Sequence, residues 1–313
     1  MGRVPRQPTS DVLGPAADAR RGRRRLALAA LALVAALALE VTSGRAASVT
    51  VPRLVAVRAA QHGGFDRVVF EFRGGIPRQR RAGYVPALTQ DASGLRIAMP
   101  ARAILRVSMA SAVAHDQQGR ATAPLAVTPA LRNVVSIKLS GGFEAVVSYG
   151  IGLAARRPFR VTALRDPDRV VLEIDNRYRA AKREVWFMNL PRFRTGREPL
   201  VSAVTRWVPA ATPATGVLDR LFAGPTAAES AHGLRLVTSD ATGFDHLALT
   251  GGQARVRLTG GCASHGSTLT IANEIVPTLR QFAGVTAVKI LDPHGATEKP
   301  SGVGSSIPTC LEP

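Results

Sequence analysis

The sequence predicts a multidomain α+β protein: an N-terminal signal or anchor helix, an all-β sandwich-like domain, and a small mixed α/β domain. Three observations support this fold class. An arginine cluster followed by an apolar run lies within residues 1–48, short β-branched runs separated by turn residues fill 50–180, and strand-like and helix-like patterns alternate over 184–313. A chain of 313 residues is long enough for two buried cores.

The N-terminal segment is typical of an export signal. Five arginines between positions 20 and 25 precede an uncharged run, Leu26–Leu39. As a helix this run spans about 21 Å, less than the roughly 30 Å of a membrane's hydrocarbon core, which favours a signal peptide. Cleavage after Ser43 or Ala47 and an uncleaved membrane anchor both remain open, as do Sec and twin-arginine export. Each alternative places the rest of the chain outside the cytoplasm.

The charge balance points to anionic partners. The chain carries 41 basic and 22 acidic residues, and 37 of the basic ones are arginine. Residues 49–180 hold most of the excess, with 20 basic and nine acidic residues. A solvated surface is the competing interpretation, since net charge concerns association rather than fold. Export and the lack of interleaved aromatic residues argue against nucleic acid as the partner.

Residues 50–180 predict a series of short strands. Their β-branched runs are separated by Gly, Pro and Asp turns, as in a sandwich or barrel. One helix is expected over residues 101–114. The expected strands cover 67–72, 95–100, 134–140, 143–153, 159–166 and 169–175.

The first of these strands raises a question of side-chain direction. Its apolar residues cannot all share one face of a regular strand, so the segment is expected to be buried on both faces or bulged near Asp66. Salt bridges are expected between Asp66 and its neighbour Arg67, and between Asp168 and its neighbour Arg169. The apolar residues concerned are Phe65, Val68, Phe70 and Phe72.

Four motifs occur in order in this block: HGGFDRVVFEFRGGIP (62–77), SGLRIAMPARAIL (93–105), SGGFEAVVSYGIGL (140–153) and PFRVTALRDPDRVVLEI (158–174). Together they resemble the AMIN-like domain of actinobacterial envelope proteins. The resemblance covers about residues 50–176 and departs from the usual pattern at Asp166–Asp168, where Asp-Pro-Asp replaces a proline pair. It implies a β-rich, non-catalytic module that localises proteins in the cell envelope, by analogy with the peptidoglycan-targeting domain of amidases.

A ligand site for an anionic cell-wall glycopolymer or peptidoglycan is one interpretation of the arginines in this block. The competing one is a solvated surface on which charges contribute little. The candidate ligand-binding residues are Arg67, Arg156, Arg157 and Arg169.

The second block, residues 184–313, predicts a mixed α/β domain. One helix is expected over 212–224, with Thr212 as cap, Pro213 in the first turn and Gly224 as terminator. A second helix, over 267–284, is expected to kink at Pro277. Expected strands cover 184–190, 199–209, 234–239, 246–250, 254–259 and 285–293, with a Gly-Gly hairpin turn at 251–252 and loops at 193–199 and 224–234.

Five motifs occur in this second block: VWFMN (185–189), VSAVTRWVP (201–209), LDRLFAGPT (218–226), ARVRLTGGC (254–262) and ANEIVPTLRQFAGVTAVKI (272–290). Together they resemble a GerMN domain. The resemblance covers about residues 184–293 and implies assembly or interaction in the envelope rather than catalysis. No cysteine directly follows the apolar N-terminal run, which separates this chain from the lipoproteins of the family.

The two cysteines of the chain, Cys262 and Cys310, leave two interpretations open. Outside the cytoplasm an even pair predicts a disulfide that ties the tail, 301–313, to the last domain. The alternative makes Cys262 a nucleophile with His265 as base, close to an expected helix N-terminus. The pair Ser230 and His232 is interpreted as loop. The sequence holds no zinc, phosphate-loop or Ser-hydrolase motif, so no metal or cofactor is expected.

The sequence therefore favours a non-enzymatic, extracytoplasmic envelope protein. It is expected to bind an anionic wall polymer or peptidoglycan, to assemble with envelope protein partners, and to contact the membrane if its N-terminal segment is uncleaved. The alternative from another class is a cell-wall hydrolase or transferase that uses Cys262 and His265.

Overall fold

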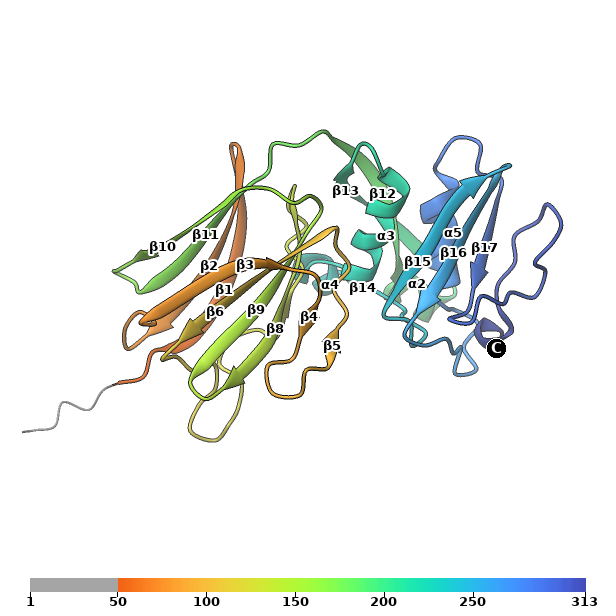
Figure 1. The fold of residues 1–313 in the computed structure, drawn as a ribbon. Helices are drawn as coiled ribbons and strands as arrows, with labels where there is room; N and C mark the ends of the chain where they lie inside the picture. The colour runs from red at the N-terminus through yellow and green to blue at the C-terminus, as the bar shows by residue number, and fades with distance from the viewer. Residues whose placement is uncertain (1–49) are drawn as a thin grey trace, which may run out of the picture. The chain divides into compact units, whose positions relative to one another are not determined.

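The computed structural model describes residues 50–313, a single unit of the chain (Figure 1). The predicted signal or anchor segment of residues 1–48 lies outside the described residues. Two separate hydrophobic cores occur in the unit. We call the part around the first core, residues 50–176, the first module, and the part around the second core, residues 180–313, the second module.

The first module is a sandwich of two antiparallel sheets whose inner faces share one core (Figure 1). A four-stranded sheet has the order β1-β2-β11-β10, and a five-stranded sheet has the order β3-β6-β9-β8-β7. A short hairpin, β4-β5, accompanies them. The strands are β1 Arg53–His62, β2 Phe65–Arg73, β3 Gln79–Val85, β4 Leu88–Thr89, β5 Arg96–Ile97, β6 Ala103–Ala110, β7 Ala126–Val127, β8 Val134–Phe143, β9 Val146–Leu153, β10 Phe159–Leu164 and β11 Arg169–Asp175.

Strand β2 alternates regularly along its whole length. Val68, Phe70 and Phe72 are buried, while Phe65 lies on the opposite, half-buried face. The prediction of a bulge or of burial on both faces is therefore wrong, because β2 pairs with β11 without a register shift. The residue that completes the inner face is Asp66, which is fully buried.

Asp66 is buried because its carboxylate binds the opposite sheet. It accepts the backbone N–H groups of Asn133 and Val134, at 2.7 and 2.9 Å, and the Asn176 side-chain amide at 2.8 Å. A buried carboxylate is tolerated when its oxygens are hydrogen-bonded in this way. Asp66 therefore joins the two sheets at one end of the sandwich.

Neither predicted salt bridge between sequence neighbours forms. Adjacent strand residues point to opposite faces, so Asp66 and Arg67 cannot meet. Arg67 instead contacts Glu173 on β11, at 2.6 Å. Asp168 approaches Arg165, at 4.0 Å, and the Arg169 guanidinium donates to a backbone carbonyl.

The helix predicted over residues 101–114 is wrong; the segment forms β6. Its sequence also alternates with a period of two, and Leu105, Val107 and Met109 are fully buried. Strands β3 and β9 pair with β6 on both sides and satisfy its backbone groups. Tertiary pairing thus overrides a pattern that sequence alone left ambiguous.

Two glycines of β9 allow a flap to lie against the outer face of the five-stranded sheet. This flap, residues 86–102, carries β4 and β5. A Cβ on Gly150 would lie 2.5 Å from the Leu88 side chain, and one on Gly152 would lie 2.8 Å from the Met99 sulfur. The glycines of SYGIGL therefore provide the close approach that the flap requires.

The second module contains two three-stranded sheets, with helices α3 and α5 packed against them (Figure 1). The orders are β13-β12-β14 and β15-β16-β17, and β16 and β17 are parallel. The elements are β12 Ala180–Asn189, α2 Leu190–Thr195, β13 Val201–Pro209, α3 Pro213–Ala223, α4 Ala227–Ala231, β14 Leu234–Arg235, β15 Gly243–Thr250, β16 Gln253–Thr259, α5 Ala272–Arg280, β17 Ala287–Leu291 and the 3₁₀ turn η1 Thr309–Leu311.

Helix α3 and the Gly-Gly hairpin occur as the sequence predicts, but the cap of α3 differs. The Thr212 side chain makes no capping hydrogen bond. Two short helices were missed, because α2 and α4 lie in segments predicted as strand end and loops. Their signals are Asn189, which caps α2, and the capping box of Thr226 and Glu229, which starts α4.

Helix α5 takes the place of a neighbouring strand along part of β12. Its Thr278 hydroxyl accepts the N–H of Trp186, and its Gln281 amide both accepts from and donates to the backbone of Glu184. Glu274, one turn before Thr278, accepts the N–H of Met188 at 2.8 Å. The side chains at 274, 278 and 281 share one face of the helix. They satisfy backbone groups that no strand reaches.

The two modules meet at Arg220 of α3, which is almost fully buried. Its guanidinium donates to the carbonyls of Leu131, Arg132 and Val134, at 2.7, 3.1 and 3.0 Å. Burial lowers the pKa of Arg220 to about 10, so it stays charged at neutral pH. Several carbonyl acceptors compensate the loss of its hydration.

Candidate functional site

The outer face of the four-stranded sheet carries pairs of arginine and acidic side chains. Because β2 alternates, Arg67 points away from the sandwich, and the register of β2 and β11 sets it directly opposite Glu173. The register of β10 and β11 sets Arg160 on the other side of Glu173. The sheet thus brings together charges that lie far apart in the sequence.

Two carboxylates on this face each bind two guanidinium groups. Glu173 accepts from Arg67 at 2.6 Å and from Arg160 at 2.5 Å. Asp175 accepts from Arg157 at 3.2 Å and from Arg177 at 2.5 Å. We call these six residues, Arg67, Arg157, Arg160, Glu173, Asp175 and Arg177, the arginine ladder. A further pair, Arg58 and Glu71, lies beside it on β1 and β2.

The ladder carboxylates are held in their ionised form. Hydrogen bonds from Arg160 and Arg67 lower the pKa of Glu173 below its ordinary value. Partial burial would raise the pKa of Asp175, but hydrogen bonds from Arg177 and Arg157 outweigh it and lower the pKa. Four guanidinium groups therefore face two carboxylates, and the ladder keeps an excess of two positive charges at neutral pH.

A groove of about 380 Å³ opens along the ladder. The Phe65 ring in its wall stacks on His62, with centroids 4.9 Å apart, and Arg67 lies 5.3 Å from the ring centre. A second hollow, lined by Tyr84, Arg156, Arg157, Pro158 and Phe159, shares its last two residues with the groove. The groove is lined by Gly63, Gly64, Phe65, Pro158, Phe159, Arg160, Glu173, Asp175 and Arg177.

The four arginines selected from the sequence are not gathered at one point. Arg67 and Arg157 belong to the ladder, and Arg156 packs over the Tyr84 ring, 4.2 Å from its centre, in the adjoining hollow. Arg169 lies at the far end of β11, opposite Glu71, and donates to the Pro167 carbonyl.

Sequence reasoning missed four members of the ladder. Glu173 could have been found from the alternation of RVVLEID, where it points outward. Which arginines meet it depends on strand register between distant segments, which no local pattern contains. The missed residues are Arg160, Glu173, Asp175 and Arg177.

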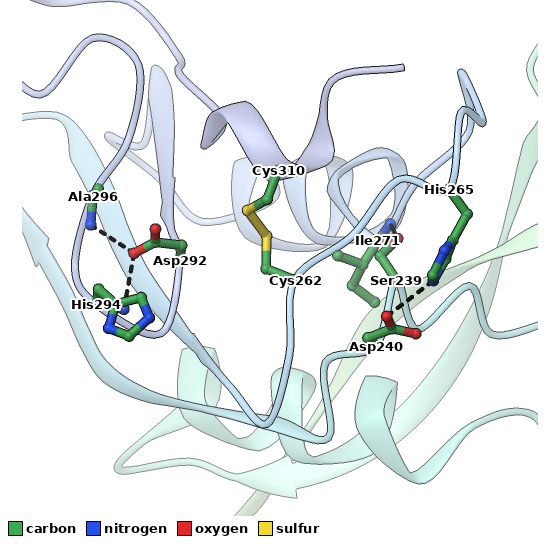
Figure 2. Close-up of a disulfide and its surroundings, with 9 residues drawn as sticks. All are labelled: Ser239, Asp240, Cys262, His265, Ile271, Asp292, His294, Ala296 and Cys310. Atoms are coloured by element: carbon green, nitrogen blue, oxygen red, sulfur yellow. Dashed lines mark hydrogen bonds and ion pairs between the residues drawn. A yellow bond between two sulfur atoms is a disulfide. The ribbon is translucent and has the colours of Figure 1, made fainter.

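The two cysteines are joined to each other. The Cys262–Cys310 disulfide has an S–S distance of 1.98 Å and a Cα–Cα distance of 5.7 Å (Figure 2). No cysteine of the chain is left as a free thiol. The Cys310 carbonyl also accepts the N–H of Ser264 at 2.7 Å, and Leu311 is buried in the second core.

The tail is attached to the second module by more than the disulfide. Ser306 forms a parallel bridge with Lys289 on β17, and η1 follows. The buried Lys289 ammonium donates to the carbonyls of Lys299 and Ser301, at 2.6 and 3.0 Å. The disulfide therefore ends a segment that is already attached to the sheet.

His265 is bound to a carboxylate rather than to a thiol. Its Nε2 lies 2.9 Å from the Asp240 carboxylate, and Figure 2 shows the imidazole turned toward Asp240. Ser264 and Ser267 accept backbone N–H groups within the loop. With the Cys262 sulfur in a disulfide, the residues named in the nucleophile hypothesis do not form a nucleophile and base pair.

Two further features bear on function within residues 50–313. No group of three or more His, Cys, Asp or Glu side chains in this part of the chain is arranged to hold a metal ion. No helix there has the length and apolar character needed to span a bilayer.

Comparison with known proteins assigns each module separately. Residues 52–176 match the AMIN-like domain family, and residues 191–292 match the family described as "Sporulation and spore germination", the Germane domain. No curated protein and no solved structure matches the chain. The first match indicates an extracytoplasmic, envelope-related role associated with peptidoglycan, and the second relates the other module to sporulation and germination.

Proposed function

We propose that the protein is a non-enzymatic, exported protein of an actinobacterial cell envelope that holds an anionic wall polymer on the arginine ladder. The second module then serves contacts with envelope protein partners. The observation that carries the proposal is the 2:1 ratio of guanidinium to carboxylate groups at Glu173 and Asp175. This ratio leaves a positive face on a module whose family is associated with peptidoglycan.

The ladder suits an anionic glycan in two ways. The Arg160 and Arg177 side chains remain 71% and 75% exposed although each is paired, so they have N–H groups available for phosphate or carboxylate oxygens. The Phe65 ring lines the same groove and offers apolar surface to the C–H faces of sugars. Charge and aromatic surface lie side by side.

The proposal includes no bond-breaking chemistry. Both cysteine sulfurs of the chain are in the disulfide, and His265 is paired with Asp240. A disulfide between the only two cysteines also favours an oxidising location outside the cytoplasm. The competing hydrolase or transferase requires a free Cys262 thiol. Hydrolysis of purified wall by the protein, lost in Cys262→Ala and in His265→Ala, would replace the present proposal with that one.

The binding proposal is tested by charge reversal on the ladder. Arg160→Glu with Arg177→Glu is compared with Arg194→Glu with Arg197→Glu, which makes the same change of charge at exposed positions of the second module. The assay is sedimentation with purified, insoluble cell wall. We expect the ladder variant to lose at least about tenfold in binding, because two charge-assisted contacts are removed and repulsion is added.

Salt provides the second measurement. Exposed charge contacts are screened over about 8 Å at physiological ionic strength, so wall binding should weaken steadily as salt is raised. Equal loss in both double variants would show that only total charge matters, and binding that survives in the ladder variant would show that the ladder is not the site. Either result contradicts the proposal.

A further inference from the structure

A second cleft lies where the flap of the first module faces helix α3 and strands β15 and β16. It has a volume of about 470 Å³ and belongs to neither the arginine ladder nor the disulfide loop. One wall comes from the flap and the start of β6, and the other from the second module. Its lining includes Leu88, Arg96, Met99, Arg102, Asp219 and Phe244.

Asp219 is a buried carboxylate with one oxygen unused. Its Oδ1 accepts from Arg102 at 2.7 Å, whereas its buried Oδ2 has no hydrogen-bond partner among the described residues. The residue is 2% exposed. Burial raises the pKa of Asp219 to about 6, against the lowering effect of Arg102 and Arg220. A carboxylate buried with half its acceptor capacity unmet is unusual and costs stability.

The same cleft carries unused donors. Arg102 donates to Asp219 through one of its guanidinium nitrogens, and its side chain is 41% exposed. Arg96, on β5, is exposed and also lines the cleft. Guanidinium groups of this kind bind carboxylates through paired N–H groups. Between these charged groups the lining is apolar, with Leu88, Met99 and Phe244.

We propose that this cleft binds an amino acid with a free α-ammonium and a free α-carboxylate. The ammonium group donates to the unused Oδ2 of Asp219, the carboxylate accepts from Arg102 and Arg96, and an aliphatic side chain lies on the apolar lining. A simple anion would face the buried carboxylate, and a simple cation would face two guanidinium groups, so the cleft favours a ligand with both charges. The site is independent of wall binding by the ladder.

Three matched probes separate the contributions of the two charges. Norleucine carries both charges and a four-carbon side chain, hexanoate lacks the ammonium, and pentylamine lacks the carboxylate. Titrations of the full chain, followed by calorimetry or by NMR shifts, should show saturable binding of norleucine. We expect hexanoate and pentylamine to bind at least about tenfold more weakly, since each loses a charge-assisted contact.

Two variants locate the site. Asp219→Asn keeps the shape of the side chain but removes its charge, and Arg96→Ala changes an exposed residue of a short strand. Asp219→Asn should weaken norleucine binding by at least about tenfold, and Arg96→Ala should weaken it by several-fold. If Asp219→Asn proves unstable, Arg96→Ala still decides the question. The ladder variant Arg160→Glu with Arg177→Glu should bind norleucine normally.

The outcomes are separable from those of the wall-binding test. Asp219→Asn should sediment with cell wall as the unmodified protein does, so loss of norleucine binding alone identifies a second site. Absence of saturable norleucine binding, equal binding of hexanoate, or unchanged affinity in a folded Asp219→Asn would each overturn the inference.

Discussion

Replacing Glu274 by Gln should make the protein more stable at neutral and alkaline pH. Glu274 is fully buried on α5, where its Oε1 accepts the N–H of Met188 at 2.8 Å, and the N–H of Val237 is shared between Oε1 and Oε2, at 3.3 and 3.2 Å. No cation among residues 50–313 is hydrogen-bonded to it. Burial raises the pKa of Glu274 from 4.5 to about 8, against the lowering effect of these two N–H groups. Gln keeps the accepting oxygen and removes the charge.

The sign and size of the effect follow from that pKa. The folded state holds a proton that the unfolded state releases above pH 4.5, so stability is highest at low pH and falls as the pH rises toward 8. The loss is about 1.4 kcal/mol per pH unit, or about 3 kcal/mol at pH 7 and about 5 kcal/mol above pH 8. Glu274→Gln should not lose stability in this way, because the Gln side chain has no proton to release in this pH range.

Urea unfolding of both proteins at several pH values from 5 to 9 measures the effect. The difference in unfolding free energy between Glu274→Gln and the unmodified protein should rise in favour of Gln up to about pH 8 and then level off. Glu298→Gln, the same change at an exposed position, serves as the control and should show no such rise. A difference that stays constant from pH 5 to 8 would refute the reasoning.

Three further changes test the packing. Cys262→Ser with Cys310→Ser opens a loop of 48 residues and should lower the free energy of unfolding in urea by about 4 kcal/mol. A reductant should destabilise the unmodified protein but not this variant. Equal stability of the variant and the unmodified protein would contradict a stabilising role of the disulfide. Arg220→Met leaves three junction carbonyls without their donor and should cost about 3 kcal/mol, whereas Arg280→Met, at an exposed position of α5, should cost little. Gly150→Ala forces a Cβ against Leu88 and should lower stability by about 1–3 kcal/mol, while Gly142→Ala, with open space around it, should not; equal effects in the two variants would show that the flap does not need the glycine.

Local patterns predicted the elements whose starting and terminating residues lie close together in the sequence. Helix α3, with Pro213 in its first turn and Gly224 at its end, and the β15–β16 hairpin with its Gly-Gly turn belong to this group. Strand β6 shows the limit. Its residues fit both a poor helix and a strand, and only its pairing with β3 and β9 decides between them.

The sites depend on a different kind of information. Glu173 meets Arg67 across 106 residues, and Asp219 meets Arg102 across 117. Such pairs arise from strand register and from the contact between modules, and the sequence around each residue contains no signal of either. Composition could locate the positive charge in residues 49–180, but only the sheet shows which arginines point outward and share a carboxylate.

The same principle explains why the most informative residues of this chain are acidic although its charge is strongly basic. An exposed arginine is compatible with any solvated surface and so distinguishes little. A buried carboxylate must be compensated, and each one here reveals a different arrangement: Asp66 binds backbone amides between two sheets, Glu274 binds backbone amides of the second module without a cation, and Asp219 retains an unused oxygen. Asp219 lines the cleft between the flap and the second module, and its unused oxygen is therefore the feature from which a ligand can be inferred.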